Sequence, residues 1–389
     1  MKVALLTDCY LPRLGGIEVQ SHDLAQHLVA LGHEVEVFTA TPGPEGQLRG
    51  EITPVDGIPV HRLAIPLPWE LPVNPLAPRE LRRRLTAGGY DVAHVQTGVV
   101  SPFAWDGTRV TLDLGLPTAM TWHCMLGQVA PGFAVAGFVH RWAARGVAMS
   151  AVSGVAAAPL RELVGPSAAV TVLPNGIDVA QWRPARTAHS TRGAPRTSSV
   201  HPPPLRLITA MRLAPRKRPR ALVELVARAE RLAGRGSLSL TILGEGPDRR
   251  RVESYLDTHG IGWVSLPGRV PRDELRERYA AADVYVSPSE LESFGIAALE
   301  ARTAGLPVVA RAGSGVGEFV THDVGGLIVP DDAVMAGALA GLAVDRGRVE
   351  RMRRWNLDHS PEQDWPHVAA LAVAEYERAI ALTGKASHR

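Results

Sequence analysis

The sequence predicts an α/β protein of two doubly wound, Rossmann-like domains that face one another across a cleft. Its 389 residues are enough for two or three domains, each able to bury its own core. Short apolar strand patterns alternate with helical patterns along both halves of the chain. This alternation is typical of parallel sheets with helices on both faces. A turn-rich segment near residue 180 divides the two series, so we expect two domains rather than one.

The N-terminal domain is assigned to residues 1–180. An apolar run at 3–7 predicts a buried strand, and Gly15-Gly16 leads from it into a helix that Gly32 ends. A helix at about 366–382 is expected to pack back on this domain. Further strands are expected at 35–38, 60–63, 91–95 and 117–122, with another helix near 79–85.

A break in the pattern separates the domains. Pro174-Asn-Gly-Ile-Asp178 has the residues of a turn, and residues 183–204 contain five prolines and no acidic residue. That composition is typical of an exposed linker or insertion. The C-terminal domain is assigned to residues 205–365, with strands expected at 205–209, 238–243, 264–266, 283–287, 307–310 and 327–329. Doubly wound sheets bind ligands beyond the carboxyl ends of their strands, so we expect the functional residues there.

Composition excludes several classes of protein. The net charge of +3 gives no reason to expect nucleic acid as a partner. Cys9 and Cys124 form neither a disulfide framework nor a metal-binding spacing, which favours a reducing cytoplasm. The N-terminus resembles a buried strand rather than a signal peptide, and no apolar run reaches 18 residues. The arginine-rich segment 79–84 could weakly touch the inner face of a membrane, although a solvated helix face is favoured.

Two glutamates bracket the start of a helix predicted at 296–303. Glu292 lies in the loop before this helix, Phe294-Gly295 opens the helix, and Glu300 lies inside it. Backbone N–H groups at a helix start are unpaired and favour electron-rich oxygens. Carboxylates beside them can accept hydrogen bonds from vicinal hydroxyls, so the pair suits a polyhydroxyl ligand. Either glutamate alone is better explained as an ordinary helix-start or solvated acid.

A second group of candidates carries positive charge or a glycine turn. Arg212 ends the first strand of the C-terminal domain, and Lys217 is one of only three lysines among 42 basic residues. Cations at a strand end, beside a helix start, are placed to neutralise a diphosphate. Gly15-Gly16 would let backbone amides approach an anion, although a plain tight turn explains it equally well. For the neighbouring Arg218 and Arg220, a solvated basic loop is an equally good interpretation.

The histidine and serine candidates are weaker. His123 follows a strand at its carboxyl end, but a lone histidine more often packs or caps than catalyses. His94 lies within a strand and is expected in the core. Ser153 is expected to cap the helix that follows it.

Several motifs are absent from the sequence. It contains no Asp-x-Asp, no His-Glu-x-x-His, no Cys-x-x-Cys and no Gly-x-x-x-x-Gly-Lys-Ser/Thr. Gly15-Gly16 and Gly244-Glu-Gly246 both lack the glycine spacing of a nicotinamide-binding fingerprint. We therefore expect no metal and no nicotinamide cofactor. The positive charge that a diphosphate leaving group needs would come from side chains and helix ends.

Taken in order, these motifs resemble a retaining glycosyltransferase of family 4, which has the GT-B fold, over almost the whole chain. The Glu292–Glu300 spacing matches the family's Glu-x7-Glu motif. The other matching segments are Gly15-Gly16, Asp91-Val-Ala-His94, Pro174-Asn-Gly-Ile-Asp178, Arg212-Leu-Ala-Pro-Arg-Lys217, Leu243-Gly-Glu-Gly-Pro247, Gly268-Arg-Val270 and the run from Gly305 to Glu318. Two residues depart from the pattern: Gln96 stands where relatives often have a second histidine, and Arg218 replaces a glycine.

The resemblance implies a role for each candidate. Arg212 and Lys217 would grip the diphosphate of a nucleotide sugar, and the backbone of Gly15 and Gly16 would meet its distal phosphate. Glu300 would bind the ribose. The main chain at Val270 would meet the base, and the transferred sugar would lie against His123, Glu292, Ser293, Phe294 and Gly295. The implied catalytic residues are His123, Glu292, Arg212 and Lys217.

The implied activity is metal-independent transfer of a hexosyl group, with retention, from a nucleotide diphosphate sugar to a hydroxyl acceptor, giving an α-glycoside. UDP is favoured over GDP as the donor nucleotide. The first domain would bind the acceptor, which could be a small molecule, a lipid or a glycan, and the second domain the donor. Two alternatives stay open. One is a nucleotide-sugar epimerase of related fold, which would need no acceptor, and the other is a catalytically silent nucleotide- or glycan-binding protein.

Overall fold

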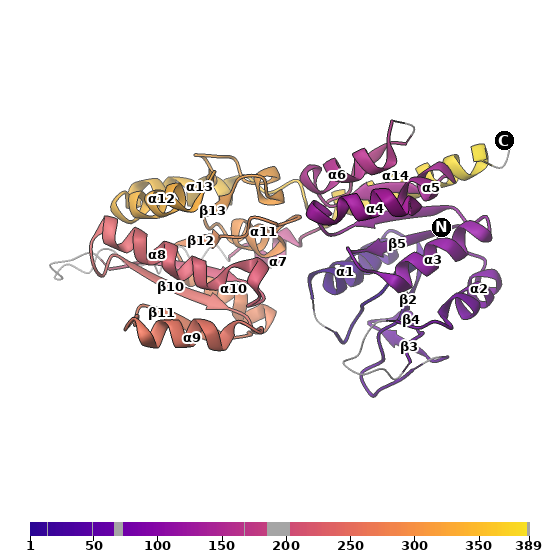
Figure 1. Ribbon diagram of the computed structural model, residues 1–389, viewed down its shortest axis with the longest axis horizontal. Helices are drawn as coiled ribbons and strands as arrows, with labels where there is room; N and C mark the ends of the chain where they lie inside the picture. The colour runs from indigo at the N-terminus through magenta and orange to yellow at the C-terminus, as the bar shows by residue number, and fades with distance from the viewer. Residues whose placement is uncertain (14, 49, 66–72, 167, 185–202, 387–389) are drawn as a thin grey trace. The chain divides into compact units, whose positions relative to one another are not determined.

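The computed structural model describes residues 1–13, 15–48, 50–65, 73–166, 168–184 and 203–386. The chain folds into two compact units (Figure 1). The first contains Met1–Gly176 together with Gln363–Arg389, and the second contains Ile177–Glu362. The chain thus leaves the first unit at Gly176 and returns to it at Gln363. Of the linker predicted at 183–204, residues 185–202 lie outside the described residues.

The sheet of the first unit has, within the described residues, eight strands in the order β3-β4-β2-β1-β5-β6-β7-β8. All neighbouring strands are parallel except β3 and β4, which form an antiparallel hairpin. Every residue of β5 is buried, as a strand covered on both faces requires. The strands are β1 (Lys2–Thr7), β2 (Glu34–Thr39), β3 (Ile52–Val55), β4 (Ile58–Arg62), β5 (Val92–Thr97), β6 (Thr118–Trp122), β7 (Ala148–Ala151) and β8 (Val170–Val172).

Helices cover this sheet, and one of them comes from the far end of the chain. The helix α14 (Trp365–Ala386) contacts β5, β6, β7 and the helix α1 (Gly16–Ala30). Trp365 stacks on His27 of α1, and a Cβ at Gly176 would lie 2.4 Å from the Trp365 ring. The turn predicted at 174–178 therefore needs its glycine to admit α14. The remaining helical segments are α2 (Ala77–Gly88), α3 (Pro102–Asp113), η2 (Gly127–Val129), α4 (Ala130–Ala136), α5 (Phe138–Ala144) and α6 (Gly154–Val164).

The sheet of the second unit is parallel throughout its described part, in the order β11-β10-β9-β12-β13-β14. Its core joins the strands to the apolar faces of α8 (Pro219–Ala233) and α12 (Asp332–Val344), which pack against one another. The strands are β9 (Leu205–Ala210), β10 (Leu238–Leu243), β11 (Val264–Gly268), β12 (Val284–Ser287), β13 (Val308–Arg311) and β14 (Gly326–Val329). The other helical segments are α7 (Val179–Trp182), η4 (Pro215–Lys217), α9 (Arg249–Thr258), α10 (Arg272–Ala281), α11 (Ile296–Thr303), η5 (Gly315–Glu318) and α13 (Arg346–Asp358).

Each sheet has one point at which the strand order reverses. In the first unit the chain runs from β1 outward through β2 and β4, then resumes on the other side of β1 with β5. In the second unit it runs from β9 through β10 to β11, then resumes on the other side of β9 with β12. Loops at such a point diverge and leave room for a ligand beyond the carboxyl ends of the strands. The predicted α/β class and doubly wound topology are confirmed.

Candidate functional site

The loops after β9 and β12 meet at the reversal point of the second sheet, and they carry the predicted charged residues. Arg212 lies two residues beyond β9, in an exposed position, and Lys217 ends the η4 turn that follows. The Lys217 ammonium donates a hydrogen bond to the Glu292 carboxylate, and the two side chains are 20% and 15% exposed. Lys217 and Glu292 are 75 residues apart in the sequence, and they are in contact in the structure. The sequence had assigned both to one site.

The Gly244-Glu-Gly246 segment holds the loop after β9 in place. A Cβ at Gly244 would lie 2.0 Å from the carbonyl oxygen of Met211, and one at Gly246 would lie 2.3 Å from that of Leu213. The Leu213 N–H donates to the Glu245 carbonyl at 2.9 Å. Glycine is required because the two backbones touch on either side of Arg212. The segment thus packs against the backbone of the loop that carries Arg212.

The loop from Glu292 to Gly295 lies against η5. The Gly315 N–H donates to the Glu292 carbonyl at 2.8 Å, and a Cβ at Gly315 would lie 2.3 Å from the Ser293 carbonyl oxygen. Phe294 is buried, and Gly295 has φ +95°, a left-handed conformation that favours glycine, at the residue before α11. The helix predicted at 296–303 is confirmed at Ile296–Thr303. The backbone of this loop is therefore fixed by contacts on the side of η5.

Glu300 and Val270 belong to two further segments of the second unit. Glu300 is half-buried in α11, and its negative charge helps to raise the pKa of the buried Tyr279 and Tyr285. Burial, then Tyr285 and Glu300, raises the pKa of Tyr279 well above its ordinary value. Val270 lies two residues beyond β11, also at a carboxyl end. The ligands of Glu300 and Val270 stay predictions.

His123, in the first unit, ends a chain of polar side chains that runs into the core. Its ring Nε2 donates to the Gln96 side-chain oxygen, because that oxygen can only accept. The Gln96 amide nitrogen is 3.1 Å from the His94 ring, and His94 also lies 2.9 Å from the Tyr376 hydroxyl of α14. His94 is buried, as predicted. Gln96, noted in the sequence only as a departure from the family pattern, is thus the residue that orients His123.

His123 and His94, the two histidines in this row of polar side chains, are uncharged at neutral pH. Burial lowers the pKa of His123 to about 4. Burial, followed by the neighbouring His123, lowers the pKa of His94 to about 3. His123 can therefore act near pH 7 as a neutral hydrogen-bonding group rather than as a resident cation.

Glu18 lies beside the predicted glycine turn, a feature that the sequence interpretation missed. Gly16 is the first residue of α1, and the space beside Gly15 is taken by the Glu18 carboxylate, where a Cβ would lie 2.3 Å from its Oε2. Arg13 lies 3.7 Å from the same carboxylate. An acid in the first turn suits the positive end of the helix dipole. An anion that approached Gly15 and Gly16 would first have to displace this carboxylate.

Asp8 marks the carboxyl end of β1 at the reversal point of the first sheet. It is buried, and its Oδ1 accepts a hydrogen bond of 3.0 Å from the Phe103 N–H near the start of α3. Burial raises the pKa of Asp8 to about 7. The sequence interpretation did not select Asp8, although its place directly after the first strand is a signal that could have identified it.

Because the pKa of Asp8 is raised, the folded protein binds this proton more tightly than the unfolded chain does. Its contribution to stability is present at low pH and lost as the pH rises from about 4 toward 7. Asp8→Asn cannot ionise, so it should gain stability relative to the wild type across that window, by at most about 1.4 kcal/mol per pH unit. Thermal unfolding of both proteins between pH 4.5 and 7.5 measures this trend. A stability difference between the two proteins that narrowed as the pH rose would contradict the prediction.

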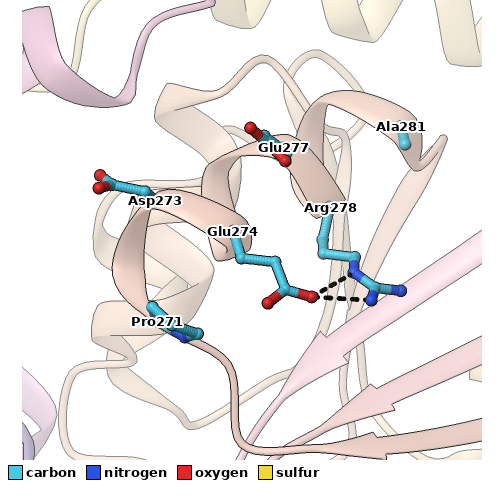
Figure 2. A pocket seen from close by; sticks show the side chains of 6 residues that line it. All are labelled: Pro271, Asp273, Glu274, Glu277, Arg278 and Ala281. Carbon is cyan, nitrogen blue, oxygen red and sulfur yellow. Dashed lines mark hydrogen bonds and ion pairs between the residues drawn. The ribbon is translucent and has the colours of Figure 1, made fainter.

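A pocket of the second unit lies apart from the predicted site residues. Figure 2 shows a pocket along α10, lined by residues from Pro271 to Ala281, in which Glu274 and Arg278 form an ion pair of 2.8 Å. The predicted site residues do not line it.

Among the residues that the structure describes, no group of three or more His, Cys, Asp or Glu could hold a metal ion. In the same part of the chain, no helix is both long and apolar enough to cross a membrane.

The chain matches known protein families over most of its length. Residues 14–181 match the family model described as Glycosyltransferase Family 4, and residues 196–354 match Glycosyl transferases group 1. The chain is 28% identical to a GDP-mannose-dependent alpha-mannosyltransferase of Mycobacterium tuberculosis, over 97% of this chain and 96% of the relative. It is 30% identical to a D-inositol 3-phosphate glycosyltransferase of Pseudarthrobacter chlorophenolicus, over 94% and 91% respectively.

A solved structure supports the same assignment at the level of the fold. Sucrose-phosphate synthase from Thermosynechococcus elongatus superposes with a TM-score of 0.74 at 21% identity, over 98% of this chain and 99% of that one. The GT-B fold expected from the sequence is therefore confirmed. With the near-complete match to the 30% identical relative, the chain belongs to the family 4 glycosyltransferases of the GT-B fold and is a glycosyltransferase.

Proposed function

We propose that this glycosyltransferase moves a hexosyl group from a nucleotide diphosphate sugar to an acceptor hydroxyl, with retention and without a metal ion. The observation that carries the proposal is the Lys217–Glu292 contact between the loops after β9 and β12. A donor of this kind has an anionic end and a polyhydroxyl end. The Lys217 ammonium suits the anionic end, and the Glu292 carboxylate suits the polyhydroxyl end. The two groups are in contact.

The other candidates extend this pattern along the donor. Arg212 would share the diphosphate with Lys217, and Glu300 would accept hydrogen bonds from the ribose. The loop of Glu292, Ser293, Phe294 and Gly295 would hold the sugar hydroxyls, while the main chain at Val270 would meet the base. In the first unit, the backbone N–H groups of Gly15 and Gly16 would bind the distal phosphate after the Glu18 carboxylate is displaced. On this proposal the second unit binds the donor and the first unit binds the acceptor.

The proposed reaction needs charge stabilisation more than proton-transfer groups. The bond between the anomeric carbon and the diphosphate oxygen breaks, and the acceptor hydroxyl oxygen bonds to that carbon on the same face. The acceptor proton passes to the departing diphosphate oxygen. Arg212 and Lys217 would stabilise the charge on the leaving group, in place of the metal that an Asp-x-Asp motif would hold. Neutral His123 would donate or accept a hydrogen bond at the sugar, and the acceptor would be held in position for attack.

For the donor nucleotide, the names of the relatives favour GDP-mannose. A relative that matches nearly the whole chain is a GDP-mannose-dependent alpha-mannosyltransferase. The sequence itself favoured UDP, so a UDP-hexose is the second candidate. For the acceptor, a D-inositol phosphate is the first compound to test, because another relative is a D-inositol 3-phosphate glycosyltransferase.

A panel of nucleotides and nucleotide sugars tests the donor. GDP, UDP, ADP, GDP-mannose and UDP-glucose are added to the protein with EDTA, and thermal stabilisation is measured. We expect one nucleotide to raise the Tm and its sugar to release nucleoside diphosphate slowly in water. If no nucleotide stabilises the protein and none is released, the donor proposal is wrong.

Acceptor screening with the best donor then tests the reaction. A product with α configuration, formed in EDTA, is expected. Formation of an epimeric sugar from the donor without any acceptor would instead indicate an epimerase, and a β-configured product would exclude retention. Activity lost in EDTA and restored by Mg²⁺ would overturn the metal-free mechanism. A protein that binds nucleotide yet neither hydrolyses nor transfers sugar would be the silent binder considered above.

A further inference from the structure

Arg218 has an unusual backbone conformation beside the candidate site. Its φ of +57° and ψ of +45° lie in the left-handed region, which carries a steric penalty for any residue with a Cβ. It directly follows Lys217 and precedes α8, and glycine would occupy this conformation without strain. A non-glycine residue retained in a strained conformation next to a functional group needs a compensating contact.

The Arg218 side chain supplies that contact through an ion cluster. Its two terminal nitrogens donate to the two carboxylate oxygens of Asp332, at 3.0 and 2.6 Å. One of them also donates to the Pro288 carbonyl at 3.0 Å and lies 3.1 Å from Glu290. Arg311 donates to the same Asp332 at 2.9 Å and lies 3.6 Å from Glu290. We name these four residues, Arg218, Glu290, Arg311 and Asp332, the Arg218 cluster.

The Arg218 cluster joins the carboxyl ends of four adjacent strands. Arg218 follows β9, Glu290 follows β12, Arg311 ends β13, and Asp332 begins α12 after β14. Arg218 is next to Lys217, and Glu290 is two residues from Glu292. The cluster therefore fixes the loop after β9 against the loop after β12 at the place where Lys217 and Glu292 meet.

The stability that this cluster adds is small. The Arg218 side chain is 23% exposed and its partner Asp332 is 38% exposed, and ion pairs with this exposure contribute little net free energy. The strain of the left-handed backbone acts in the opposite direction. Stability alone gives no reason for arginine instead of glycine here, so the side chain must serve the geometry of the loops.

We propose that Arg218 is a positioning residue that holds Lys217 and Glu292 in register for the donor. The inference depends on the proposed function, in which Lys217 and Glu292 bind a nucleotide diphosphate sugar. Arg218 touches neither donor nor acceptor in this scheme. It acts through the loop backbones, at Pro288 and at its own residue.

Two substitutions of Arg218 separate the side chain from the backbone. Arg218→Gly removes the Arg218 contacts and relieves the strain, so its Tm should stay within about 3 °C of the wild type. Arg218→Ala removes the same contacts but keeps the strain, so it should be the less stable of the two. Both should lose about tenfold in kcat/KM for the donor, because loop displacement misplaces the charged pair. If activity follows Tm instead, so that the glycine variant is fully active, the inference is overturned.

A double-mutant cycle and a control complete the test. Asp332→Asn should lower kcat/KM in the same way, and its effect should be smaller in the Arg218→Gly background than in the wild type, because both changes break the Arg218–Asp332 contact. The control is Arg220→Ala, an exposed arginine that pairs with Glu224 at 2.9 Å outside the cluster and should leave activity unchanged. A wild-type protein that neither binds nor turns over any nucleotide sugar would overturn both proposals. A wild type that is active alongside an equally active Arg218→Gly would overturn only this one.

Discussion

Replacing Lys217 with alanine should lower turnover by about 100- to 1000-fold while leaving both units folded. The ammonium lies at the carboxyl end of β9, where the diphosphate of the donor is expected, and it balances the Glu292 carboxylate. Its loss removes a positive charge at the point where negative charge develops on the leaving group. The measurement is kcat at saturating donor, with circular dichroism and thermal unfolding to confirm the fold.

A matched control for Lys217 lies next to it in the chain. Arg216 belongs to the same η4 turn but is exposed, so Arg216→Ala should retain most of the activity. Lys217→Ala also leaves Glu292, only 15% exposed, without this partner. Adding Glu292→Gln removes that uncompensated charge and should restore any Tm lost, but not the activity. Near-normal turnover in Lys217→Ala would refute the diphosphate assignment.

Gly315→Ala should be nearly as damaging, although Gly315 carries no functional group. Its Cβ would lie 2.3 Å from the Ser293 carbonyl oxygen and 2.8 Å from the Phe294 Cα, both backbone atoms that cannot rotate away. The loop that carries Glu292 must move or the second unit must lose about 1–3 kcal/mol of stability. We expect at least a tenfold loss in kcat/KM for the donor together with a lower Tm.

Gly317 provides the comparison for this variant. It belongs to the same η5 turn, is exposed, and a Cβ there would meet nothing within 4 Å. Gly317→Ala should therefore behave like the wild type in both measurements. If Gly315→Ala and Gly317→Ala gave the same Tm and the same kcat/KM, the packing of the loop from Glu292 to Gly295 on η5 would not matter for the site.

Much of the fold could be predicted because its strands are apolar and its helices are clearly bounded. The helix at 296–303 was predicted to the residue, and Ser153 caps α6 by accepting from the Ala156 N–H, as expected. The sequence did not predict β7, whose Ala148–Ala151 segment has small residues and low strand propensity. It forms a strand because it pairs between β6 and β8, which is tertiary information.

The candidate site was predicted in its members but not in its contacts. Lys217 and Glu292 could be selected because one is a rare lysine and the other lies near a helix start. Their ion pair follows from strand order, which places β9 beside β12. The chain from His123 through Gln96 to Tyr376 depends on α14, which lies far along the sequence from β5. Arg218 could not be separated from an ordinary basic loop until its backbone conformation was known.

The return of α14 to the first unit has a consequence for how the protein is made. Trp365, Val368, Ala372 and Tyr376 belong to the core that surrounds β1 and β5, yet the ribosome adds them after the whole second unit. The apolar surface of the first unit that α14 covers therefore stays uncovered while residues 177–362 are synthesised. The second unit can fold during this time, before the first unit is complete. His94 gains its Tyr376 partner only after α14 has been synthesised, so the polar side chains behind His123 are completed later than residues 177–362.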